Sequence, residues 1–95
     1  RVSKRGISRE EIQRAMIVPI EEVGLRYGIR MKKEGKNLVG LCPLHHEKHP
    51  SFYIYLQSNS FYCYGCQKGG DVITFVKLLY GYSFPEAVRW LIREK

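Results

Sequence analysis

Two short stretches decide the fold of this chain: Cys42-Pro43-Leu44-His45 and Cys63-Tyr64-Gly65-Cys66. In each, two residues separate a pair of metal-binding side chains, so one turn can present both to the same ion. Three thiolates and one imidazole are a ligand set that structural zinc prefers, with no coordination position left open for a substrate. Soft sulfur ligands also disfavour Mg²⁺ and Ca²⁺. The spacing therefore predicts one structural zinc ion and argues against a hydrolytic zinc site.

Two neighbouring histidines compete for the imidazole position. His46 follows His45 directly, and His49 lies three residues further on. The Cys-x-x-His spacing favours His45, which leaves His46 as a solvated residue or one just outside the ligands. His49 could face solvent or a phosphate.

The number of cysteines indicates whether the protein resides in a reducing or an oxidising compartment. Three cysteines fit a disulfide framework poorly, and no secretory signal opens the chain. A redox pair made of Cys63 and Cys66 alone would leave Cys42 and His45 unexplained. Thiolates that hold a metal favour a reduced cytoplasm, so we expect a cytoplasmic protein. No apolar run approaches the length that spans a bilayer, so we expect no membrane partner.

The segment between the two ligand pairs predicts a β-hairpin. Ser51–Leu56 and Ser60–Tyr64 alternate apolar and polar-aromatic residues, and a turn at 57–59 separates them. This hairpin would return the second ligand pair beside the first. One face would carry Phe52, Ile54 and Phe61 toward the core. The other face would offer four tyrosines: Tyr53, Tyr55, Tyr62 and Tyr64.

Helices and one further hairpin complete the sketch. Capping residues and apolar spacing predict helices over 9–16, from Pro19 to Gly28, over 72–80 and from Ser83 onward, with a hairpin turn at 34–37. The fold class is α+β, a small antiparallel sheet flanked by helices. We expect an N-terminal basic segment with a short helix at 1–16, and the metal-binding domain at 17–95. The chain has 95 residues, and so small a core favours a stabilising metal.

An ordered series of motifs resembles a known family. The motifs are Lys32–Leu41, Cys42–His45, Glu47–Phe52, Phe61–Cys66, Gly69–Phe75 and Ser83–Val88. Together they resemble the N-terminal zinc-binding domain of bacterial DnaG-type DNA primases, a Cys-His-Cys-Cys zinc ribbon. Four positions depart from the family pattern: Leu38, His46, His49 and Gln67, the last at a place where glycine is common.

This resemblance implies a function. Such a domain binds single-stranded template DNA and helps select the site where RNA primer synthesis begins in DNA replication. It works with a separate polymerising domain that uses Mg²⁺, and a replicative helicase is a further expected partner. The present chain shows no acidic cluster with metal-binding spacing. We therefore expect a binding module, not an enzyme by itself.

The residues point independently to a surface for single-stranded DNA. The formal net charge is +7, and aromatic rings for base stacking beside cations for phosphates are what such binding requires. The predicted contacts are the four tyrosines Tyr53, Tyr55, Tyr62 and Tyr64, with the cations Arg30, Lys32, Lys33, Lys36 and Lys48.

Other functions remain open on the sequence. The chain could be a stand-alone zinc ribbon that contacts proteins of the replication machinery. It could instead read duplex DNA as transcription-factor ribbons do, in which case it would bind a duplex at least as tightly as a single strand.

Overall fold

The computed structural model describes residues 6–46 and 48–94. Residues 1–5, the start of the predicted basic segment, lie outside the described part, as do residues 47 and 95. Among the described residues, no helix is long and apolar enough to cross a membrane.

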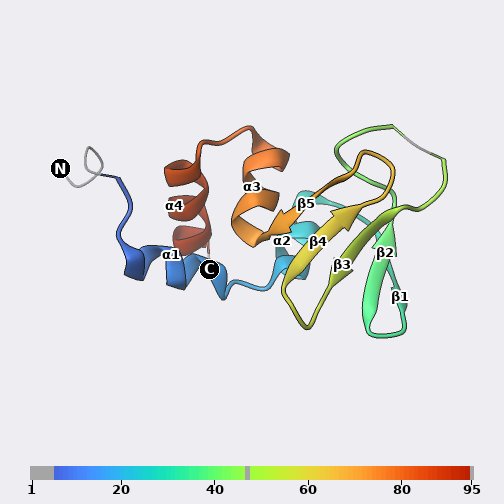
Figure 1. Cartoon of the computed structure of the whole chain (residues 1–95), viewed down its shortest axis with the longest axis horizontal. Helices are drawn as coiled ribbons and strands as arrows, with labels where there is room; N and C mark the ends of the chain where they lie inside the picture. Colours follow the sequence, from blue (N-terminus) through green and yellow to red (C-terminus); the bar gives the residue numbers. More distant parts are fainter. Residues whose placement is uncertain (1–5, 47, 95) are drawn as a thin grey trace.

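The described residues form a five-stranded antiparallel sheet in which each strand pairs with the next along the chain (Figure 1). Its strands are β1 (Met31–Glu34), β2 (Asn37–Gly40), β3 (Phe52–Tyr55), β4 (Ser60–Cys63) and β5 (Lys68–Asp71). The two predicted hairpins are confirmed, with strand ends moved by one or two residues. The predicted α+β class is therefore correct.

The sequence did not predict β5, because Gly69 and Gly70 give this strand no side-chain alternation. β5 pairs with β4 through Tyr62↔Gly69 and Phe61↔Gly70. A Cβ atom at Gly69 would collide with Cδ1 of Tyr62 and lie 2.8 Å from the carbonyl oxygen of Phe61. The glycine thus lets the last strand lie close against β4.

Four helices are present in the described residues, and each begins or ends as its local sequence predicts. They are α1 (Arg9–Met16), α2 (Ile20–Tyr27), α3 (Val72–Tyr80) and α4 (Phe84–Glu94). Ser8 and Glu11 form a reciprocal capping box at the start of α1, and the Asp71 carboxylate accepts a hydrogen bond from the backbone N–H of Thr74 in α3. Gly28 and Gly81 end α2 and α3 in the left-handed conformation.

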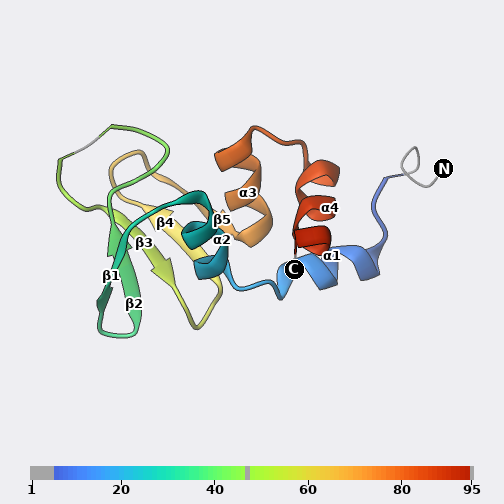
Figure 2. The same ribbon diagram turned by 180° about the vertical axis from the view of Figure 1, so that it is seen from behind.

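One face of the sheet forms the core. Phe52, Ile54 and Phe61 are buried, and α2 lies over this face (Figures 1 and 2). From α3, Phe75 packs its ring 5.6 Å from that of Phe52 and 4.9 Å from that of Phe61. On its other side α3 packs against α4 and α1, so the helices extend the molecule to 45 Å along its longest axis. Ala15 of α1 is fully buried in the same core. The predicted domain boundary after residue 16 stays a prediction.

One turn residue ties the sheet to the start of α2. The Asn59 side-chain oxygen accepts a hydrogen bond from the Ile20 backbone N–H at 2.8 Å. Its amide nitrogen donates to the carbonyl oxygens of Met16 and Val18 at 3.0 and 2.9 Å. These three bonds satisfy backbone groups of the α1–α2 connection and fix where α2 sits.

Candidate metal centre and tyrosine face

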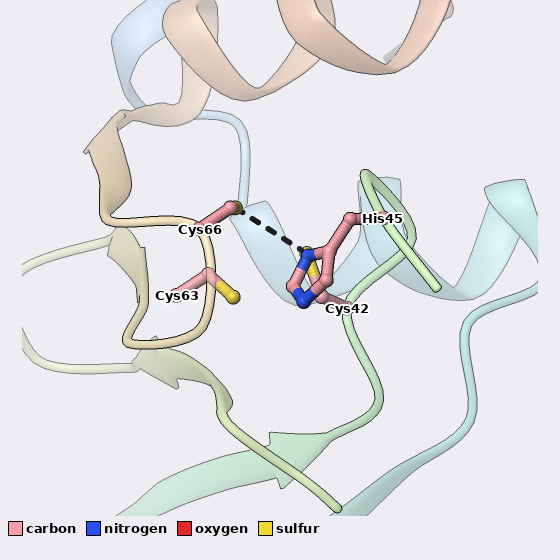
Figure 3. A group of neighbouring side chains, drawn as sticks. All are labelled: Cys42, His45, Cys63 and Cys66. Atoms are coloured by element: carbon pink, nitrogen blue, oxygen red, sulfur yellow. Dashed lines mark hydrogen bonds between the residues drawn. The ribbon is translucent and has the colours of Figure 1, made fainter. Parts of the chain in front are cut away.

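The four predicted ligand residues come from two places in the sheet and meet at one point. Cys42 and His45 lie in the loop that follows β2. Cys63 ends β4, and Cys66 lies in the turn between β4 and β5. The hairpin of β3 and β4 returns the second pair beside the first, as the sequence predicts (Figure 3).

The ligand atoms of these four residues all lie within 4.8 Å of one another. The sulfur atoms of Cys42 and Cys66 are 3.9 Å apart. Zinc–sulfur bonds of about 2.3 Å in a tetrahedron would separate two sulfurs by about 3.8 Å. The arrangement thus fits one tetrahedral zinc ion bound by three thiolates and one imidazole.

Neighbouring groups support the cysteine sulfurs and the imidazole. The backbone N–H of Leu44 donates to the Cys42 sulfur at 3.3 Å, and the Ser51 hydroxyl lies 3.6 Å from the Cys63 sulfur. A Cβ atom at Gly65 would lie 2.8 Å from Nε2 of His45, so only glycine leaves room for the ring. Sequence analysis missed Ser51 and Gly65, although the position of Gly65 between the last two cysteines was a usable signal.

The thiols differ in acidity. Burial raises the pKa of Cys42 to about 12. Burial also opposes ionisation of Cys63, but hydrogen bonds from the Cys66 backbone N–H and the Ser51 hydroxyl lower the pKa of Cys63 below its ordinary value. Because several thiolates cannot share a buried site without a compensating charge, the donor set favours a bound cation.

The two competing histidines lie apart from this centre. His46 and His49 are exposed, and neither belongs to the cluster of four among the described residues. His45 is half-buried within it.

The side of the sheet opposite the core carries a connected group of rings, here called the tyrosine face. It consists of Tyr53, Tyr55, Tyr62 and Tyr64. Tyr53 stacks on Tyr55 with ring centroids 6.1 Å apart, and Tyr64 meets Tyr53 and Tyr62 edge-on at 5.6 and 4.8 Å. Tyr64 is 59% exposed, and the other three are half-buried.

Two hydroxyl groups on this face are joined. The oxygens of Tyr55 and Tyr64 lie 3.0 Å apart, and this hydrogen bond raises the pKa of Tyr55 to about 12. The Tyr55 ring therefore carries no negative charge that would repel a phosphate when a base stacks on it.

The pairing register of the strands shows on which side of the sheet the predicted cations of β1 lie. Lys32 pairs with Val39, which pairs with Tyr53, so these side chains share one side of the sheet. Lys33 pairs with Leu38 and points to the other side of the edge strand. The remaining predicted cations are exposed on loops and turns: Arg30, Lys36 and Lys48.

Comparison with known proteins agrees with this geometry. The family model described as the CHC2 zinc finger matches residues 8–95. The DNA primase of Enterococcus faecalis is 48% identical over 61 residues, which are 64% of this chain and 10% of that protein. The DNA primase of Halalkalibacterium halodurans is 40% identical over 84 residues, or 88% of this chain and 14% of that protein.

A solved structure is similar as well. The zinc-binding and RNA polymerase domains of the Aquifex aeolicus primase superpose on this fold with a TM-score of 0.81 and 32% sequence identity. The match covers 93% of this chain and 22% of that one. The chain thus spans only 10% to 14% of the length of these curated relatives.

Proposed function

This chain belongs to the CHC2 zinc-finger family of DNA primase zinc-binding domains, and on that premise we propose that it binds single-stranded template DNA and helps select where primer synthesis begins. Its partners in this role are a primase polymerising domain and, further, a replicative helicase, in the cytoplasm. The chain itself acts as a binding module, and nucleotide joining belongs to the polymerising domain.

The observation that carries the proposal is the tyrosine face. Four rings in mutual contact lie on the side of the sheet that α2 leaves uncovered, and Lys32 lies in the same row of paired residues. Rings of this kind stack on unpaired bases at about 1–3 kcal/mol per base. A duplex hides its base faces, so the same surface favours a single strand.

We assign zinc a structural role in this surface. The ion is held by Cys42, His45, Cys63 and Cys66, which connect the loop after β2 to the β4–β5 turn. Tyr64 lies between the last two ligands, so the metal also fixes the most exposed ring of the tyrosine face. With four protein ligands, the ion has no position for substrate.

The phosphate contacts are ranked by position. Lys32 comes first because it shares a side of the sheet with the tyrosines. Arg30, Lys36 and Lys48 can reach the strand from the flanking loops. Lys33 faces the opposite side of β1 by register, but it lines the same edge hollow as Lys32 and Tyr53, so it can reach a phosphate around the edge of the sheet.

The direct test is fluorescence anisotropy of the zinc-loaded domain with labelled single-stranded and duplex DNA of the same sequence. Salt should be varied from about 50 to about 200 mM. We expect tighter binding to the single strand, with an affinity that falls as salt rises. Equal or tighter duplex binding would contradict the proposal, and no binding at all would favour a module that contacts proteins.

Variants locate the surface. Tyr64→Ala should weaken single-strand binding about fivefold or more, whereas Tyr82→Ala, on the α3–α4 side, should not. Lys32→Ala should reduce the salt slope by about one unit. Arg93→Ala removes one positive charge from α4 and serves as its matched control, with an unchanged slope.

A further inference from the structure

A groove of about 570 Å³ lies at the end of the β1–β2 hairpin. We call it the hairpin groove. Tyr27 contributes one wall from the end of α2, Val39 and Leu41 contribute another from β2 and its extension, and Pro43 and Pro50 come from the loop that carries Cys42 and His45. Tyr27 is 42% exposed and Leu41 is 49% exposed, so apolar side chains face solvent here.

The charged residues that line the hairpin groove, among those that the structure describes, are both cations. They are Arg30 and Lys32. An apolar groove with two cations suits a ligand that has a flat apolar part joined to an anion. Its volume also lies within the range of about 300–1,000 Å³ typical of small-ligand sites.

The hairpin groove is continuous with the tyrosine face. A second hollow of about 480 Å³ shares Lys32, Val39 and Pro50 with it and extends to Tyr53. Lys33 and Glu34 complete its lining, so its cations outnumber its one carboxylate among the described residues. A strand lying on the tyrosines would therefore have a path along Lys32 into the groove. This continuity favours a nucleic acid over an acidic peptide as the occupant.

We propose that one nucleotide of the single-stranded template leaves the stack on the tyrosine face and places its base in the hairpin groove. Tyr27 and Leu41 contact the base, and Arg30 and Lys32 contact the adjoining phosphates. The inference rests on the proposed function and deepens it, because stacking on tyrosines tolerates any base. A walled groove distinguishes bases by size and shape, which selection of an initiation site requires.

The test is a scan of abasic sites. Single-stranded oligonucleotides of about six to eight nucleotides, each lacking one base, are titrated against the zinc-loaded domain by anisotropy. We expect one position at which loss of the base lowers affinity at least about fivefold more than at its neighbours. The same scan is run with Leu41→Ala, and with Leu25→Ala as the matched control. Leu25 is 69% exposed on α2 and does not line the groove.

In Leu41→Ala, the loss of affinity specific to one position should disappear. The abasic oligonucleotide lacking that base should bind Leu41→Ala with an affinity within about twofold of its affinity for the unchanged protein, because the base and Leu41 act through the same contact. Leu25→Ala should keep the full pattern. Leu41 precedes the ligand Cys42, so zinc content is measured as well. If Leu41→Ala does not retain zinc, the scan is repeated with Tyr27→Ala, and that result is used instead.

The outcomes separate the two proposals. Single-strand binding with equal losses at every position, or a pattern that survives in the zinc-loaded groove variant, overturns the groove assignment alone and leaves the groove to another occupant such as a peptide. Failure to bind single-stranded DNA overturns the proposed function, and the groove assignment falls with it.

Discussion

Gln67, which follows the last ligand residue, has a backbone conformation that costs a residue with a side chain. Its φ angle is 58°, in the left-handed region, and its N–H donates to the carbonyl oxygen of Cys63 at 2.7 Å. The turn around Cys63 and Cys66 imposes this conformation. A left-handed residue other than glycine costs about 1–2 kcal/mol, which explains why glycine is common at this position in the family that the sequence resembles.

Replacing Gln67 with glycine should therefore stabilise the zinc-loaded protein. Glycine removes the left-handed cost but loses more entropy on folding, so we expect a net gain of about 0.5–1 kcal/mol. The melting temperature at fixed excess zinc should rise by several degrees.

Gln57→Gly provides the matched control. Gln57 is also an exposed glutamine in a turn, but it is not among the described residues with positive φ. Its replacement should lower the melting temperature. If the melting temperature falls in both variants, the positive φ angle of Gln67 does not reduce the stability of the protein.

Asn59 also has a positive φ, of 52°, and its side chain makes the three hydrogen bonds to the α1–α2 connection. Asn59→Gly keeps the backbone conformation and removes only those bonds. At about 0.5–1.5 kcal/mol each, their loss should reduce the free energy of unfolding by about 2–3 kcal/mol. Asn59→Ala should cost about 1 kcal/mol more because alanine disfavours positive φ.

The measurements are urea unfolding at fixed zinc and amide hydrogen exchange. The Ile20 N–H, which donates to Asn59, should exchange faster in both variants. Unchanged protection of Ile20 would mean that another group fixes the start of α2.

At the scale of elements, the close pairing of β5 with β4 depends on a residue without a side chain at the centre of β5. The β4–β5 hairpin positions both Cys63 and Cys66, and its strands approach closely only because Gly69 lies opposite Tyr62. The metal centre and the tyrosine face are thus joined through one glycine.

Gly69→Ala should push the Tyr62 ring aside and separate the two strands. We expect a loss of stability of about 1–3 kcal/mol, as for other overpacked sites, together with weaker single-strand binding. Gly24→Ala is the contrasting variant. Its added Cβ would lie 3.7 Å from Cδ1 of Ile54, an ordinary contact, and alanine favours a helix.

Thermal unfolding and anisotropy of both variants provide the measurement. Gly24→Ala should leave stability unchanged or raise it by up to about 1 kcal/mol. If Gly69→Ala and Gly24→Ala have the same stability and the same affinity for single-stranded DNA, β5 can move away from β4 without a loss of stability.

The sequence predicted those elements whose signals are local. Caps such as Ser8 with Glu11 and the alternation of Phe52, Tyr53 and Ile54 act over a few residues, and they correctly located four helices and two hairpins among the described residues. The zinc ligands were predictable because their spacing is itself a chemical requirement.

The remaining features depend on contacts between distant residues. β5 has glycines where a strand signal would need side chains. Asn59 bonds to residues 39–43 positions away, and the hairpin groove joins Tyr27 to Pro50. In α3, Val72, Ile73, Phe75 and Val76 are buried, while Leu78 is exposed because α3 contacts neighbours on only part of its surface.

At the scale of the whole molecule, α3 connects two layers into one core. Phe75 packs on the sheet rings Phe52 and Phe61, while the opposite side of α3 packs on α4. Trp90 of α4, the single tryptophan of the chain, has its ring 5.0 Å from that of Tyr80 in α3. A change in the sheet should therefore reach Trp90, although this residue lies in the helical layer.

Removal of zinc should unfold both layers together. The metal connects the loop after β2 to the β4–β5 turn, and a core of this size rarely sustains a fold without such support. A zinc chelator should abolish the near-ultraviolet circular dichroism of the tyrosines and shift Trp90 fluorescence to longer wavelength at the same chelator concentration. His45→Ala should behave like the chelated protein, whereas His46→Ala, the adjacent exposed histidine, should keep zinc and the native spectra. Native Trp90 emission in zinc-free protein would instead show that the helical layer folds without the metal, and that zinc supports the sheet alone.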